Sequence, residues 1–179
     1  FAGSEWIGAI TRKDARIPEG RKYHGSELKK PEAKAAWAAV DTLAKKSIYL
    51  RREFYVAKKV KDATAYVCGL GFYEFSLNGE KVGDSEFAPL WSDYDKSVYY
   101  NTYDVTSQVK KGGNAIGVLL GNGFYNVQGG RYRKLQISFG APTLRFRMVV
   151  NYEDGTCETI VSGKDWKYDF SPVLFNCIY

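Results

Sequence analysis

The chain has 179 residues, 45% of them hydrophobic, and this size suits one domain with a substantial buried core. The net charge is +6, but the Lys and Arg residues are spread along the chain and no nucleic-acid-binding motif accompanies them, so we do not expect nucleic acid as a partner. No stretch approaches a membrane span and none has the pattern of a signal peptide, so we expect no membrane partner. Because the sequence starts without Met and ends abruptly, we interpret it as a piece of a longer protein.

The first 46 residues differ in pattern from the rest of the chain. Residues 5–10, EWIGAI, are typical of a strand, and the polar, glycine-containing stretch after them predicts a long surface loop. Residues 31–46 carry the helical pattern, because their apolar side chains recur at helical spacing: Ala33, Trp37, Val40 and Ala44. We therefore expect residues 1–46 to contribute a strand, a loop and a short helix that packs on a domain formed by residues 47–179.

From Ser47 onward, segments with strand character follow one another. They cover residues 48–56, 63–70, 72–77, 97–105, 114–122, 143–152 and 156–163. Cys68 lies in an apolar strand and is expected to be a small buried hydrophobe. Asn78-Gly79 and Asp154-Gly155 each predict a tight turn between two strands. Many strands, tight turns and little helix indicate an all-β fold, an antiparallel β-sandwich or jelly roll with one short helix.

The residues that could catalyse a reaction or hold a metal do not form a convergent set. The single histidine, His24, lies in the polar loop, and the three cysteines are too few and too widely spaced for a zinc site or a disulfide framework. Carboxylates do crowd one region, as the paired acids of a glycoside hydrolase would: Asp84, Glu86, Asp93, Asp95 and Asp104. We interpret them as groups that cap turns and strand ends, and predict no catalytic residue and no metal site.

Aromatic and polar residues in two loops have the composition of a sugar-binding surface, because ring faces pack on the C–H surface of a sugar while polar side chains bond its hydroxyls. The candidates are Trp91, Asp93, Tyr94, Asp95, Asn122, Phe124, Tyr125, Asn126 and Arg131. The alternative is that these aromatic residues fold back as a plug over the end of the sandwich. If the target is a polyanionic carbohydrate, the basic residues Arg131, Arg133 and Lys134 predict that its affinity falls as the salt concentration rises.

Several ordered motifs resemble the N-terminal β-sandwich domain of bacterial α-L-rhamnosidases. The matching segments are GLGFYEFSLNGEKVGD at residues 69–84, PLWSDY at 89–94, YNTYDVT at 100–106, and Gly113 through Tyr125. The ending, with a D-G turn, a strand, a tryptophan and Ser171-Pro172, is similar too, and the resemblance covers about residues 47–179. Many members have Trp where this chain has Phe124.

The resemblance implies a galactose-binding-like sandwich that serves as a non-catalytic module of a larger enzyme. That enzyme would be an inverting glycoside hydrolase removing terminal L-rhamnose, with its catalytic acid and base in a separate (α/α)₆ barrel. The resemblance implies L-rhamnose-containing oligo- or polysaccharides and the other enzyme domains as partners, and a periplasmic or extracellular location. A calcium ion takes part in some related modules, but no residue here is assigned to it. Two roles remain open: sugar binding, or purely structural packing on the barrel.

Overall fold

The computed structural model describes residues 46–94, 96–127, 137–173 and 176. It contains the strands β1 (Ile48–Val56), β2 (Val60–Leu70), β3 (Tyr73–Leu77), β4 (Glu80–Lys81), β5 (Asn101–Asp104), β6 (Gly112–Leu120), β7 (Asn126–Val127), β8 (Ile137–Ser138), β9 (Thr143–Tyr152), β10 (Cys157–Val161) and β11 (Lys167–Phe170). The described part of the chain contains no helix, and hence none long and apolar enough to cross a membrane.

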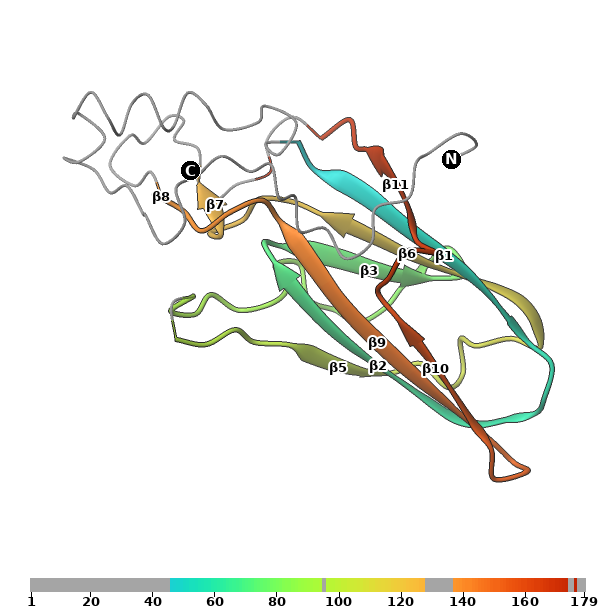
Figure 1. Cartoon of the computed structure of the whole chain (residues 1–179). Coiled ribbons are helices and arrows are strands. Elements are labelled where there is room, and N and C mark those ends of the chain that lie inside the picture. The colour runs from blue at the N-terminus through green and yellow to red at the C-terminus, as the bar shows by residue number, and fades with distance from the viewer. Residues whose placement is uncertain (1–45, 95, 128–136, 174–175, 177–179) are drawn as a thin grey trace, which may run out of the picture.

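Two antiparallel sheets form the layers of a sandwich (Figure 1). One has five strands in the order β11-β1-β6-β3-β4, the other has four in the order β10-β9-β2-β5, and β7 pairs with β8 in a small separate ribbon. The expected antiparallel β-sandwich is therefore confirmed. The expected strand at 5–10 lies outside the described residues, as does the expected helix at 31–46 except for its last residue, Lys46.

Strict alternation of side chains explains why these segments form half-buried strands. In β1, Leu50, Phe54 and Val56 are buried, and in β2 the inward side chains Ala63, Ala65 and Val67 are fully buried. Cys68 lies on the opposite face of β2 from Val67 and is only half-buried, so the expected buried position is wrong.

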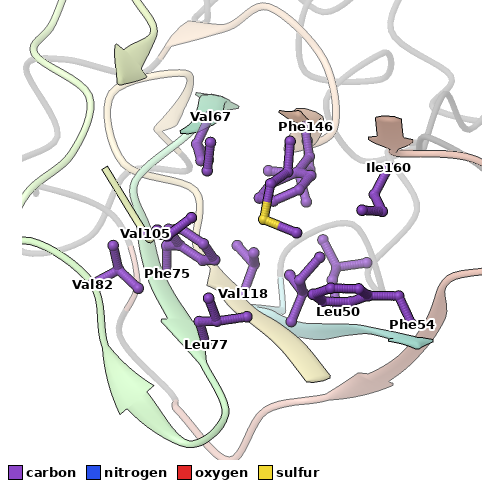
Figure 2. Packing of buried hydrophobic residues seen from close by; sticks show 14 of the residues in the cluster. Leu50, Phe54, Val67, Phe75, Leu77, Val82, Val105, Val118, Phe146 and Ile160 are labelled. Atoms are coloured by element: carbon purple, nitrogen blue, oxygen red, sulfur yellow. The ribbon is translucent and has the colours of Figure 1, made fainter. Parts of the chain in front are cut away.

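The core fills the space between the two sheets, as Figure 2 shows for Phe75, Val118 and Phe146. The ring of Phe75 meets that of Phe146 edge-on with centroids 5.5 Å apart, and Phe146 meets Trp166 at 5.2 Å. Trp166 is 2% exposed, and its indole N–H donates to the Val161 carbonyl at 2.9 Å. Burying one such large apolar side chain stabilises the fold by about 1.5–3 kcal/mol.

Both expected tight turns are present. Asn78 and Gly79 have φ values of 55° and 85°, as a type I′ turn between β3 and β4 requires. In the β9–β10 hairpin the amide of Gly155 donates to the Tyr152 carbonyl at 3.1 Å, and Gly155 takes a φ of 82°. Tight turns of this kind fix the register of the two strands that each one joins.

The long β4–β5 connection and residues 121–127, which follow β6, meet at one end of the sandwich (Figure 1). The β4–β5 connection is fastened to the sheet by the amide of Tyr73, which donates to the Ala88 carbonyl at 2.7 Å. The segment after β6 is fastened by the amide of Gly121, which donates to the Phe72 carbonyl at 2.7 Å. This end of the molecule carries most of the residues that the sequence singled out.

Candidate functional site

A stack of aromatic rings, which we call the rim platform, is formed by Phe72, Phe87, Trp91 and Phe124. The Trp91 and Phe124 rings are stacked, with centroids 5.3 Å apart and planes 28° apart. Phe72 meets Phe124 edge-on at 5.7 Å and contacts Phe87 at 5.5 Å. Trp91 nevertheless remains 64% exposed, so one broad ring is held in place by neighbours and still faces solvent.

Glycine at position 123 makes the rim platform possible. Gly123 has a φ of 52°, and a Cβ there would lie 2.8 Å from the backbone nitrogen of Phe72. A larger residue would therefore push Phe124 away from the ring below it. The glycine-rich pattern next to Phe124 has a local structural reason: it allows two loops to approach closely enough for their rings to stack.

Tyr94 and Tyr125 pack together with Phe139, in a second aromatic group beside the platform. Tyr94 meets Tyr125 edge-on at 5.1 Å and Phe139 at 5.2 Å, and the Tyr125 hydroxyl donates to the Phe139 carbonyl at 3.1 Å. Burial raises the pKa of Tyr94 to about 12, with the neighbouring Tyr125 adding to the shift, and burial also raises the pKa of Tyr125. Both tyrosines thus have the packing of a plug over the sandwich end, the alternative that the sequence left open.

Asn122 and Asn126 are buried, at 0% and 1% exposed, and they hold the loop in shape. The Asn126 side-chain amide donates to Oδ1 of Asn122 at 2.7 Å, and the Asn122 amide donates to Oδ1 of Asn176 at 2.6 Å. The amide of Gly123 donates to the Asn176 carbonyl at 2.8 Å. These hydrogen bonds hold the loop that carries Phe124, and Asn176 takes part in them.

Asp93 lies at the exposed tip of the β4–β5 connection. Its backbone carbonyl accepts the amides of Lys96 and Ser97 at 2.8 and 2.9 Å, and its carboxylate lies 3.1 Å from the Lys96 ammonium. Asp93 thus closes the turn at this tip. The candidates Asp95 and Arg131 lie outside the described residues.

The remaining carboxylates of this region have structural partners. Asp104 accepts the Thr106 amide at 3.0 Å and its hydroxyl at 2.6 Å, and these hydrogen bonds lower the pKa of Asp104. The expected role of Asp104 at a strand end is therefore confirmed. Glu86 accepts a hydrogen bond from Lys81 at 2.8 Å. Among the described residues, no three His, Cys, Asp or Glu side chains gather closely enough to hold a metal ion.

Sequence reasoning missed Phe72, Phe87 and Phe139, which complete the two aromatic groups. Phe87 was detectable in principle, because it stands four residues before Trp91 in the same connection; the structure leaves it 66% exposed. Phe72 and Phe139 carry no such signal. Their positions depend on contacts between loops that are distant in the sequence.

Comparison with known proteins identifies the family. Residues 58–179 match the α-L-rhamnosidase N-terminal domain. An α-L-rhamnosidase of Formosa agariphila is 39% identical over 182 residues, which cover 98% of this chain and 18% of that protein. The structure of Streptomyces avermitilis α-L-rhamnosidase complexed with L-rhamnose superposes with a TM-score of 0.67 at 41% identity, over 72% of this chain and 12% of that one.

A Pleurotus ostreatus lectin solved in complex with GalNAc superposes with a TM-score of 0.51 at 19% identity, over 94% of this chain and 35% of the lectin. At this low identity the likeness shows the fold alone. The chain spans less than a fifth of the rhamnosidases it matches. The motifs, the two-sheet architecture and the family match agree, and the chain belongs to the α-L-rhamnosidase N-terminal domain family.

Proposed function

We propose that this chain is a non-catalytic module of an α-L-rhamnosidase and that its rim platform contacts the sugar substrate. The parent enzyme would remove terminal L-rhamnose by means of catalytic residues in another domain, an (α/α)₆ barrel. The relative from Streptomyces avermitilis was solved with L-rhamnose, which makes this sugar the natural first ligand to test.

The exposed indole of Trp91 is the observation that carries this proposal. Exposed apolar side chains that gather in one patch mark an interaction surface, and Trp91 is 64% exposed within the same ring cluster as Phe87, which is 66% exposed. Its stacking on Phe124 fixes the orientation of the ring, so little conformational entropy is lost when a sugar packs on it. The carboxylates around it are engaged in turns and ion pairs, which favours a binding role over hydrolysis by this chain.

Calorimetric titration of the chain with L-rhamnose tests the proposal. We expect weak binding, and we expect Trp91→Ala to reduce affinity about tenfold, because loss of a stacked ring costs about 1.4 kcal/mol. Tyr55→Ala is the matched control: Tyr55 is 69% exposed and lies at the other end of β1 from the rim. No binding at millimolar sugar, or equal losses in the two variants, would remove the binding role.

A second role, packing against the rest of the enzyme, is favoured by a different observation. Val98, Tyr99 and Tyr100 are 46%, 52% and 64% exposed, although they follow one another directly. A strand on a sheet would bury every other residue, so this segment presents apolar side chains on both sides. Such a surface is typical of a contact with another protein domain.

Hydrogen–deuterium exchange distinguishes this second role. If residues 98–100 dock on the parent enzyme, their amides should exchange more slowly in the full-length protein than in the 179-residue chain. Equal exchange in the two proteins would exclude docking through this segment. The sugar titration is independent of that result.

A further inference from the structure

The outer face of the five-stranded sheet carries a trough that the sequence motifs did not indicate. In β6 the side chains of Ile116 and Val118 point into the core, so Ala115, Gly117 and Leu119 face outward. Pairing places Arg51 of β1 and Ser76 of β3 on either side of Gly117. Small residues on a strand between larger neighbours leave a hollow of about 380 Å³.

The floor of this trough is kept low by Gly117. The Ser76 hydroxyl donates to the Gly117 carbonyl at 3.2 Å and so lies across the strand. A Cβ at position 117 would be only 2.6 Å from that hydroxyl oxygen. Any side chain at this position would displace Ser76 and fill the trough.

A second hollow of about 220 Å³ continues the trough toward the rim platform. Glu74 and Leu119 line both hollows, and the second is bordered by Phe72 and Phe87, two rings of the platform. Residues 115–121 alone advance about 20 Å at the usual strand rise. Because the two hollows share Glu74 and Leu119, they form one groove that leads to Phe72 and Phe87 of the platform. The groove follows β6, which lies between β1 and β3 in the sheet (Figure 1).

The charged groups along the groove are paired with one another. Arg51 forms an ion pair with Glu53. Lys81 lies 2.8 Å from Glu86 and 3.9 Å from Glu74, and its hydrogen bond to Glu86 is the main reason that the pKa of Lys81 is raised. A polyanion would have to compete with these carboxylates. A neutral chain of hydroxyl groups can instead accept from the cations, donate to the carboxylates and pack its C–H surface on the apolar floor.

A protein segment is a poorer occupant of this groove. An extended peptide that adds to a sheet needs a free strand edge, and β6 is bonded on both sides, by β1 and β3. An apolar helix needs a broad apolar groove, whereas charged side chains form both walls here: Arg51 on one side and Glu74 on the other.

We propose that this groove binds a neutral oligosaccharide chain, so that the module grips several consecutive sugar units rather than one terminal sugar. The inference rests on the proposed sugar-contacting role and extends it: the rim platform holds one end of the chain, and the groove along β6 holds the units that follow.

Calorimetry on the 179-residue chain tests this with L-rhamnose, a linear neutral rhamnose oligosaccharide and an oligogalacturonate of matched length. We expect the neutral oligosaccharide to bind at least tenfold more tightly than the single sugar, and more tightly than the oligogalacturonate. Ala115→Leu should abolish that gain by filling the groove. Gly113→Leu is the control, because residue 113 lies two positions along the same face of β6, outside the groove and with nothing within 4 Å of its Cβ.

Amide chemical shifts of the unmodified chain provide a second measurement that does not depend on any variant. The neutral oligosaccharide should shift the amide signals of Ala115 and Gly117, and L-rhamnose alone should not. Affinity that does not rise with chain length, an oligosaccharide affinity unchanged by Ala115→Leu, or tighter binding of the oligogalacturonate would each overturn the groove proposal. Oligosaccharide binding that is lost in Ala115→Leu but insensitive to Trp91→Ala would support the groove and overturn the rim proposal.

Discussion

Asn114→Ala should destabilise this domain by about 3 kcal/mol, because one buried side-chain amide joins three segments. Asn114 is 4% exposed. Its Oδ1 accepts the Lys110 amide at 2.8 Å and the Asn78 side-chain amide at 2.9 Å. Its Nδ2 donates to the carbonyls of Lys110 at 2.7 Å and Gly112 at 3.1 Å. The β5–β6 connection is thereby bound to the β3–β4 turn.

The magnitude follows from the groups that the substitution leaves without partners. Each hydrogen bond contributes a net of about 1 kcal/mol, and a buried donor or acceptor that is left unsatisfied costs about 1–3 kcal/mol. The Gly112 carbonyl lies in a half-exposed residue and can turn to water, so its loss costs less than the others. The sum is about 3 kcal/mol, which corresponds to a fall in Tm of about 10 °C for a domain of this size.

Urea denaturation followed by far-UV circular dichroism measures this loss, with Asn151→Ala as the matched control. The Asn151 amide makes one hydrogen bond, to Asp62 at 2.6 Å, at a half-exposed site. Its partner is a carboxylate, but water can replace the lost donor at this half-exposed site, so its removal should cost about 1.5 kcal/mol. If Asn114→Ala costs no more than Asn151→Ala, the buried amide does not organise this end of the sandwich and the reasoning fails.

The other predictions concern titration, thiol reactivity and backbone geometry. Hydrogen bonds from Lys58 and Thr156 lower the pKa of Asp154 in the folded state. The ionised carboxylate therefore stabilises the fold above the unfolded pKa of about 4, and this stabilisation is lost as the pH falls through the folded pKa. The Tm deficit of Asp154→Asn should shrink below about pH 4, and a deficit that does not change with pH would contradict the reasoning. Burial raises the pKa of the Cys68 thiol despite nearby Arg145, whereas Cys157 is exposed. Peptide-resolved iodoacetamide labelling should therefore modify Cys157 before Cys68, and equal rates at these two cysteines would count against the half-buried position of Cys68. A Cβ at Gly71, where φ is 124°, would overlap the Gly121 carbonyl oxygen. Gly71→Ala should therefore lower the free energy of unfolding, measured by urea denaturation, by about 3 kcal/mol. No change in that free energy would refute the close approach of the Gly71 and Gly121 backbones.

Local patterns predicted the long strands well. The segments 48–56 and 143–152 coincide with β1 and β9, because a run of alternating apolar residues has one stable way to lie on a core. The alternation pattern did not predict a strand that forms only because it pairs with a neighbouring strand. β11, with the sequence KYDF, is short and half charged, and it is a strand because it pairs with β1.

The candidate site was predicted in part. Trp91 and Tyr94 stand three positions apart in one loop, and the sequence offered no way to distinguish them. Packing distinguishes them: Tyr94 is enclosed by Tyr125 and Phe139, while Trp91 stacks on Phe124 with one face left open. Asn122 is a residue type common in sugar-binding sites, but here it is fully buried and donates to Asn176. The sequence could not reveal this, because a side-chain amide bonds protein groups as readily as it bonds a sugar hydroxyl group.

By itself the sequence determined the two-layer fold, its hairpins and its family, because alternation, turn dipeptides and ordered motifs are all local properties of the chain. Only the tertiary structure decided which rings face solvent, and that Gly117, Ser76 and Arg51 lie in one row across the sheet. The reason is geometric. A groove exists only between side chains of neighbouring strands, and the neighbours of β6 are β1 and β3, which come from distant parts of the chain and meet only in the folded sheet.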